Sequence, residues 1–162
     1  MKRYFGHALV PALMMVSIAT SADLPIKKVL TLDVARKIAA AAEAEAVRRG
    51  STVVIVVVDE GGYPIVLHRL DDTQVASVEV GIGKARTAAI FRRPSKVFED
   101  QIRTGRVAAL ALPGATPLQG GLPIEYEGKV IGAIGVSGNT PQEDEEIAKA
   151  GVDAVASTIA RE

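Results

Sequence analysis

The chain has 162 residues, 48% of them hydrophobic, with 19 basic and 19 acidic residues and no cysteine. This length and apolar content are typical of one globular domain with its own core. The balanced charge lacks the basic excess of a nucleic-acid-binding surface. The absence of cysteine excludes disulfides, thiol nucleophiles and cysteine-ligated metal sites.

Residues 1–22 have the pattern of a secretory signal peptide. Lys2 and Arg3 precede an apolar run, and small residues follow it up to Ala22. A basic start, a short apolar segment and small residues before the cut are what signal peptidase recognises. The run is too short to cross a bilayer comfortably, which takes roughly 20 apolar residues. We therefore predict cleavage after Ala22, or after Ser21, and a periplasmic or secreted protein; an uncleaved anchor is the alternative.

Removal of this leader would leave a single domain at residues 23–162. That mature chain contains no methionine and one histidine, His68. Metal sites that need several histidine or cysteine ligands cannot be built from one such subunit. We therefore expect no metal centre, and no membrane span after cleavage.

The first part of the mature chain predicts a helix followed by a β-hairpin. Thr31 is a plausible N-cap for an alanine-rich helix at 32–49, which Gly50 ends. The β-branched run at 52–58 is too short and too valine-rich for a helix, and it reads as a strand buried on both faces. After an Asp-Glu-Gly-Gly turn, residues 63–70 form the second strand.

The middle of the chain predicts helices and one undecided segment. Residues 75–91 carry an apolar helical stripe that contains Gly81 and Gly83. Each glycine costs roughly 1 kcal/mol relative to alanine, so either close helix packing or a nearby ligand would explain them. Residues 94–104 predict a short helix, and residues 107–112 fit either a strand or a loop.

A second hairpin and a last helix follow a loop rich in proline and glycine. The strands are expected at 122–126 and 129–136. Thr140 and Glu143 fit a capping box at the start of a helix that extends to about Ala160. The element order, helix, hairpin, helices, hairpin, helix, favours an α/β (α+β) domain with an antiparallel sheet and helices on both faces.

Two residues at the end of the first hairpin are candidates for ligand binding. Strand alternation places His68 with Val66 and Leu70, and Arg69 on the opposite face with apolar neighbours. An arginine on an apolar face needs a carboxylate, which either the protein or a ligand could supply. A single histidine on a strand is usually structural or exposed, so a ligand-binding role for His68 is the alternative interpretation.

Lys84 and Thr87 form another candidate pair on the helix at 75–91. They are three residues apart and therefore share a helix face, where a cation and a hydroxyl could meet one anionic group. A solvated face is the alternative.

The glycine-rich segment at 132–138 does not match two known site motifs. Asn139 excludes a nucleophile elbow, and no Gly-Lys-Ser/Thr sequence of a phosphate-binding loop follows. Ser137 would lie where a strand enters a helix, and free backbone N–H groups there could hold an anion. Tight backbone packing is the alternative. The acidic residues at 143–146 fit the helix dipole, or a weak cation site.

Five motifs in order resemble the GlcG/HbpS-like family, which includes haem-binding proteins and the C-terminal domain of PduO-type adenosyltransferases. They are Val58-Asp59-Glu60-Gly61-Gly62, Arg69-Leu70-Asp71, Lys84-Ala85-Arg86-Thr87-Ala88, Gly120-Gly121-Leu122-Pro123-Ile124 and Gly132-Ala133-Ile134-Gly135-Val136-Ser137-Gly138.

The resemblance implies a profilin-like three-layer α/β/α sandwich with a central antiparallel sheet. It also implies homo-oligomers and, in some members, haem binding or degradation. It adds Gly120 and Gly121 to the candidate ligand-binding residues, which already include Ser137.

Haem requires an apolar slot, an axial ligand and cations for two propionates. Arg69, Lys84 and Arg86 could meet the propionates. The candidate axial ligands left open by the sequence are His68, Tyr63, Tyr126, Lys84, Thr87 and Thr116.

The leading hypothesis is an exported protein that binds an anionic small molecule, with haem or a related tetrapyrrole as the named candidate. The alternative is a small enzyme acting on a hydroxy or keto acid. In that case Arg69 would hold the carboxylate and Lys84 would act as general base or electrostatic clamp. A structural module without a pocket is the third possibility.

Overall fold

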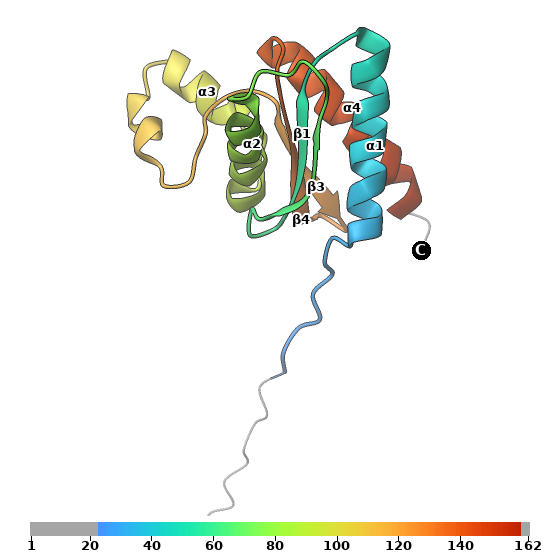
Figure 1. The fold of residues 1–162 in the computed structure, drawn as a ribbon. Helices are drawn as coiled ribbons and strands as arrows, with labels where there is room; N and C mark the ends of the chain where they lie inside the picture. The colour runs from blue at the N-terminus through green and yellow to red at the C-terminus, as the bar shows by residue number, and fades with distance from the viewer. Residues whose placement is uncertain (1–22, 160–162) are drawn as a thin grey trace, which may run out of the picture.

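The structure, a computed structural model, describes residues 23–159, with side chains described up to Val155, so the predicted leader lies outside it. Figure 1 shows one domain from which the N-terminal arm extends. The elements are α1 (Leu32–Arg49), β1 (Val54–Asp59), β2 (Pro64–Arg69), α2 (Ser77–Phe91), α3 (Lys96–Arg103), the 3₁₀ helix η1 (Val107–Ala111), β3 (Gly121–Tyr126), β4 (Lys129–Ser137) and α4 (Pro141–Ile159).

The four strands form one antiparallel sheet in the order β2-β1-β4-β3. Helices α1 and α4 cover one face and α2 covers the other, while α3 and η1 lie beside α2 (Figure 1). This is the three-layer α/β/α arrangement expected from the order of the elements. No helix of the described part of the chain is long and apolar enough to cross a membrane.

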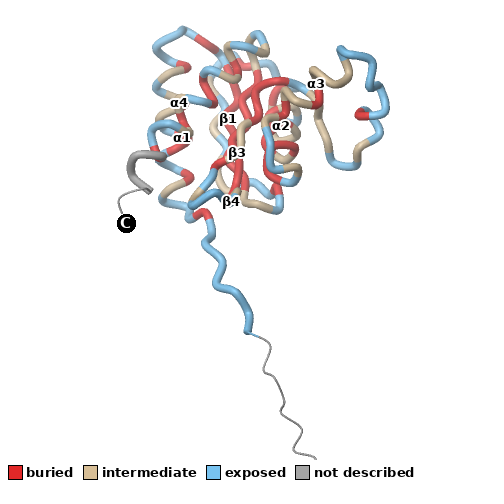
Figure 2. The backbone as a smooth tube through the Cα atoms, turned by 180° about the vertical axis from the view of Figure 1, so that it is seen from behind, coloured by how far each residue is buried: buried red, intermediate tan, exposed pale blue. Residues whose placement is uncertain are grey.

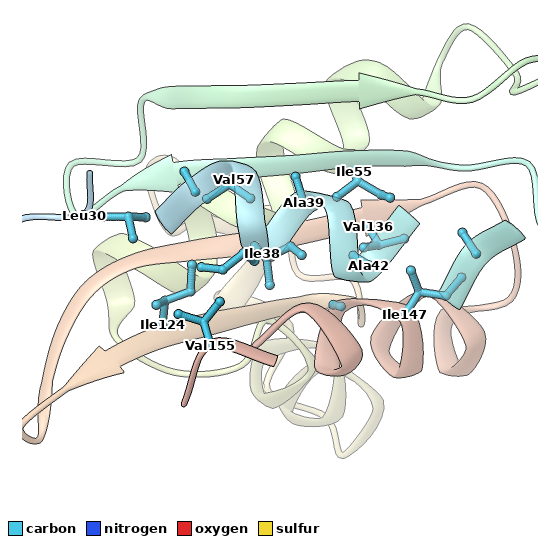
Figure 3. Packing of buried hydrophobic residues seen from close by; sticks show 14 of the residues in the cluster. Leu30, Ile38, Ala39, Ala42, Ile55, Val57, Ile124, Val136, Ile147 and Val155 are labelled. Atoms are coloured by element: carbon cyan, nitrogen blue, oxygen red, sulfur yellow. The ribbon is translucent and has the colours of Figure 1, made fainter. Parts of the chain in front are cut away.

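Strand β1 lies in the middle of the sheet and is buried on both faces, as its valine-rich sequence predicts. Ile55 and Val57 point into the core under α1 and α4 (Figure 3), whereas Val54, Val56 and Val58 point toward α2. All five side chains are fully buried. Figure 2 shows this buried centre and the exposed arm that precedes α1.

The two cores differ in the size of their side chains. The α1/α4 core contains large residues such as Ile38 and Ile147, but α2 packs on the sheet through alanines and Gly81. A Cβ added at Gly135 of β4 would lie 2.3 Å from the carbonyl oxygen of Gly81 and 2.5 Å from the backbone nitrogen of Ala85. Helix α2 therefore rests directly on the backbone of β4, and packing explains Gly81.

The predicted helix caps are present. The hydroxyl of Thr31 accepts from the Val34 N–H at 3.4 Å, and Gly50 ends α1 with φ 67°. Thr140 and Glu143 form the reciprocal capping box of α4. The undecided segment at 107–112 is neither strand nor loop, because residues 107–111 form η1.

Candidate functional site

Lys84 is buried and paired inside the protein. Its side chain is 5% exposed, and its ammonium donates to the Asp144 carboxylate at 2.7 Å and to the Val136 carbonyl at 3.0 Å. The pair joins the middle of α2 to the first turn of α4 across the end of β4. As placed, the ammonium of Lys84 is satisfied by protein groups and is not presented to a ligand.

Asp144 also occupies the anion-binding position predicted at the start of α4. Its carboxylate accepts from the Asn139 N–H at 3.0 Å. A protein oxygen therefore already binds a backbone N–H that could have bound an anionic ligand. Burial raises the pKa of Asp144 above its ordinary value, and the hydrogen bonds from Lys84 and the backbone act against that rise. The acidic first turn therefore supplies half of a buried ion pair.

Gly120 and Gly121 let the chain pass closely over this ion pair. A Cβ at Gly120, whose φ is 120°, would lie 2.9 Å from the Val136 carbonyl oxygen and 3.0 Å from the Lys84 ammonium. A Cβ at Gly121 would lie 2.2 Å from the carbonyl oxygen of Lys84. Both glycines serve the close approach of the loop to α2.

Thr87 fixes the loop before β3 onto α2. Its hydroxyl donates to the Gly83 carbonyl at 2.7 Å and accepts from the Thr116 N–H at 2.7 Å. A Cβ at Gly83 would lie 2.2 Å from the Thr116 hydroxyl, so the absence of a side chain at Gly83 leaves room for Thr116. Packing therefore explains Gly83 as it explains Gly81.

Of the other predicted residues, Ser137 follows the Val136 carbonyl that accepts from Lys84, whereas His68 and Arg69 lie on the edge strand β2. Ser137 is buried at the end of β4. His68 faces α1, where its Nδ1 lies 2.6 Å from a carboxylate oxygen of Glu43. Arg69 is exposed on the edge strand β2 and donates to the Thr73 carbonyl at 3.1 Å. Because β1 separates β2 from β4, the structure does not bring Arg69 and Lys84 together.

A groove of about 790 Å³ lies at the end of the sheet where β3 turns into β4. Three segments that are far apart in the sequence form it: the arm before α1, the residue that ends α2, and the β3–β4 hairpin. Its lining combines apolar surface, one tyrosine, four cations and two carboxylates. The lining residues are Pro25, Ile26, Lys27, Lys28, Arg92, Glu125, Tyr126, Glu127, Gly128, Lys129, Val130 and Ile131.

Two residues that line the groove have a left-handed backbone conformation, which is usually adopted by glycine. Arg92 ends α2 with φ 54°, and Glu127 begins the hairpin turn with φ 49°. Asp72, with φ 60°, is the one further non-glycine residue with positive φ in the described range. This conformation costs a non-glycine residue about 1 kcal/mol and points to a side chain with another role.

Comparison with known proteins identifies the family. The family model described as "Haem degrading protein HbpS-like" matches residues 30–153. The chain belongs to the HbpS-like family. Escherichia coli K12 protein GlcG is 40% identical over 111 residues, which are 68% of this chain and 83% of that protein.

Solved HbpS-like structures share the fold. A double mutant of Streptomyces reticuli HbpS has a TM-score of 0.76 and 31% identity, covering 90% of this chain and 99% of the other. The solved PduOC:Heme complex has a TM-score of 0.72, covering 78% of this chain and 95% of the other; at 24% identity it shows the common fold alone.

The groove was not foreseen as a site in this HbpS-like chain. Tyr126 was one candidate among several, and Lys28, Lys129 and Arg92 gave no local signal of a shared surface. They lie in an extended arm, at a helix end and in a hairpin turn, and none of these segments indicates a binding site by itself. The fold brings the three segments together at one end of the domain.

Proposed function

We propose that this HbpS-like protein binds haem or a related tetrapyrrole in the groove between the arm and the β3–β4 hairpin. The observation that carries the proposal is one groove whose lining combines apolar residues and a tyrosine with four cations and two carboxylates. The haem-related description of the family and the haem complex solved for PduOC with the same fold support it.

The residues present fit a porphyrin with two carboxylates. A volume of about 790 Å³ lies within the roughly 300–1,000 Å³ of small-molecule sites. Ile26 and Val130 offer apolar contact to a ring system. Lys28 and Arg92 are cations that could pair with the propionates. When bound, haem would add an iron centre to a chain whose described residues hold no cluster of three metal-ligating side chains.

Arg92 offers a sharp test because its backbone favours glycine. Arg92→Gly should keep or raise stability by up to about 1 kcal/mol, since it relieves the left-handed strain, yet weaken haemin binding about fivefold by removing one cation. Titration with haemin, followed by the Soret band, measures the affinity, and thermal unfolding measures stability.

Asp72→Gly is the matched control, because it relieves the same backbone conformation at a residue that does not line the groove. It should leave haemin affinity unchanged, and Arg92→Lys should restore most of it. Absence of haemin binding by the parent protein, or equal affinities of the Arg92→Gly variant and the parent, would count against the proposal.

Export belongs to the same proposal and rests on the leader at residues 1–22. We expect the processed protein in the periplasm or medium to begin at Asp23, or at Ala22 if the cut follows Ser21. Intact-mass measurement of the fractionated protein tests this. An unprocessed chain confined to the cytosolic fraction would contradict it. Self-association, implied by the resemblance, stays a prediction that light scattering of the processed protein would measure.

A further inference from the structure

We infer that two surfaces of this chain, opposite in charge, bind each other between two copies of the protein. The basic surface lies on η1 and the end of α3, and the acidic surface lies at the start of α2. The inference names surfaces for the self-association expected above and does not depend on haem binding. Each surface exposes apolar side chains that the rest of the described chain leaves uncovered.

The basic surface carries an apolar patch on η1. Residues three apart share one face of a 3₁₀ helix, so Val107 and Leu110 lie on the same face, and they are 64% and 66% exposed. Ala109 is the buried residue of this helix. Single exposed apolar residues need no explanation, but adjacent ones form a patch that favours a contact. We define the basic surface by Arg103, Arg106, Val107 and Leu110.

Two guanidinium groups border this patch. The guanidinium of Arg106, directly before η1, donates to a neutral group, the side-chain oxygen of Gln101, at 2.6 Å. Arg103 pairs with Glu99 at 2.6 Å, but the Arg103 side chain is 62% exposed and that of Glu99 is 12% exposed. The carboxylate is therefore largely covered, and the surface presents two cations.

The acidic surface is formed by the turn after β2 and the segment that leads into α2. Val75 is 72% exposed there. Asp71, Asp72 and Glu79 lie within four residues of it in the sequence, and all three are exposed. None of these carboxylates forms an ion pair with another described residue. Arg69 donates to a backbone carbonyl of this turn and offsets one of the three negative charges at most.

The two surfaces complement each other in charge and in apolar content. In a protein interface the apolar centre is removed from water, while charges on the rim orient the partners. A second copy of the chain supplies the counterpart of each surface. An anionic membrane would attract the basic surface but would repel the acidic one, so a second copy accounts for both.

The test exchanges charges between the two surfaces and measures self-association of the processed protein by sedimentation equilibrium. Arg106→Glu and Asp71→Arg, made separately, should each weaken self-association about tenfold, because each places like charges across the contact. The chain that carries both substitutions should associate as the parent does, since opposite charges face each other again. Leu110→Ser should also weaken association by about tenfold or more, because it removes a large apolar side chain from the contact.

Arg36→Glu and Val47→Ser are the matched controls. Both positions are exposed on α1, which lies on the opposite side of the domain from α3 and η1 (Figure 1). Both variants should associate as the parent does, and far-ultraviolet circular dichroism should be the same for every variant, which shows that each is folded.

Two results would overturn the inference while leaving haem binding standing. One is association of the Arg106→Glu and Leu110→Ser variants at the strength of the parent. The other is failure of the double substitution to restore association. A monomeric parent that instead sediments with phosphatidylglycerol vesicles would also overturn it and would assign the basic surface to lipid.

Discussion

Lys84→Ala is expected to destabilise the protein by about 3–5 kcal/mol, a large share of the stability of a domain of this size. The substitution leaves the Asp144 carboxylate, which is 2% exposed, without its cation. It also opens space under Gly120. Urea denaturation of the parent and the variant measures the difference in the free energy of unfolding.

Lys149→Ala is the control, because Lys149 pairs with Asp153 on the exposed face of α4. An exposed pair contributes about 0–1 kcal/mol. Replacing both buried partners, as in Lys84→Met with Asp144→Leu, should recover much of the lost stability, because no unpaired charge remains. Equal, small effects at Lys84 and Lys149 would show that the buried pair is solvated in solution and that Lys84 is accessible after all.

Gly135→Ala is expected to cost about 3 kcal/mol or to prevent folding, although it adds one methyl group. The new Cβ would lie 2.3 Å from the Gly81 carbonyl oxygen and 2.5 Å from the Ala85 nitrogen, and both are backbone atoms of α2. Because backbone atoms cannot move aside as a flexible side chain can, α2 would have to lift from β4. Overpacking of this kind typically costs 1–3 kcal/mol, and more where relaxation is blocked.

Gly128→Ala is the matched control, because no heavy atom lies within 4 Å of a Cβ built there. It should cost about 1 kcal/mol, from its left-handed φ of 72° alone. Thermal unfolding and near-ultraviolet circular dichroism follow both variants. A cost at Gly135 no larger than that at Gly128 would show that α2 does not pack on β4 as closely as described.

The layers of the fold could be predicted from local patterns. A run of consecutive valines in β1 requires two apolar faces, and Thr140 with Glu143 marks the start of α4 whatever the rest of the chain does. These signals depend on neighbours in sequence. The segment at 107–111 carries no comparable period, and its 3₁₀ form could not be predicted in this way.

The pairing of the candidate site residues inside the protein could not be predicted, because their partners are distant in the sequence. Lys84 and Asp144 are 60 residues apart, and nothing in either neighbourhood indicates that one neutralises the other. Lys84 therefore looked available for an anionic ligand. Gly120 and Gly121 likewise drew attention as motif residues, whereas their role is to bring the loop against α2.

The groove shows the opposite case, in which residues without a motif are brought together by the fold. Lys28 and Tyr126 are almost a hundred positions apart, yet the ammonium lies beside the ring. The left-handed backbone of Arg92 is equally invisible in the sequence, since arginine gives no sign of positive φ. Contacts of this kind, between residues far apart in the sequence, could not be predicted from local sequence patterns.

The most direct test of the account is to map the bound porphyrin by amide chemical shifts, with diamagnetic gallium protoporphyrin IX added to the labelled protein. We predict that the shifts concentrate at residues 25–28, Arg92 and residues 125–131, with little change at β2. Shifts centred on His68 and Arg69, or on the loop over Lys84, would contradict the assignment of the groove.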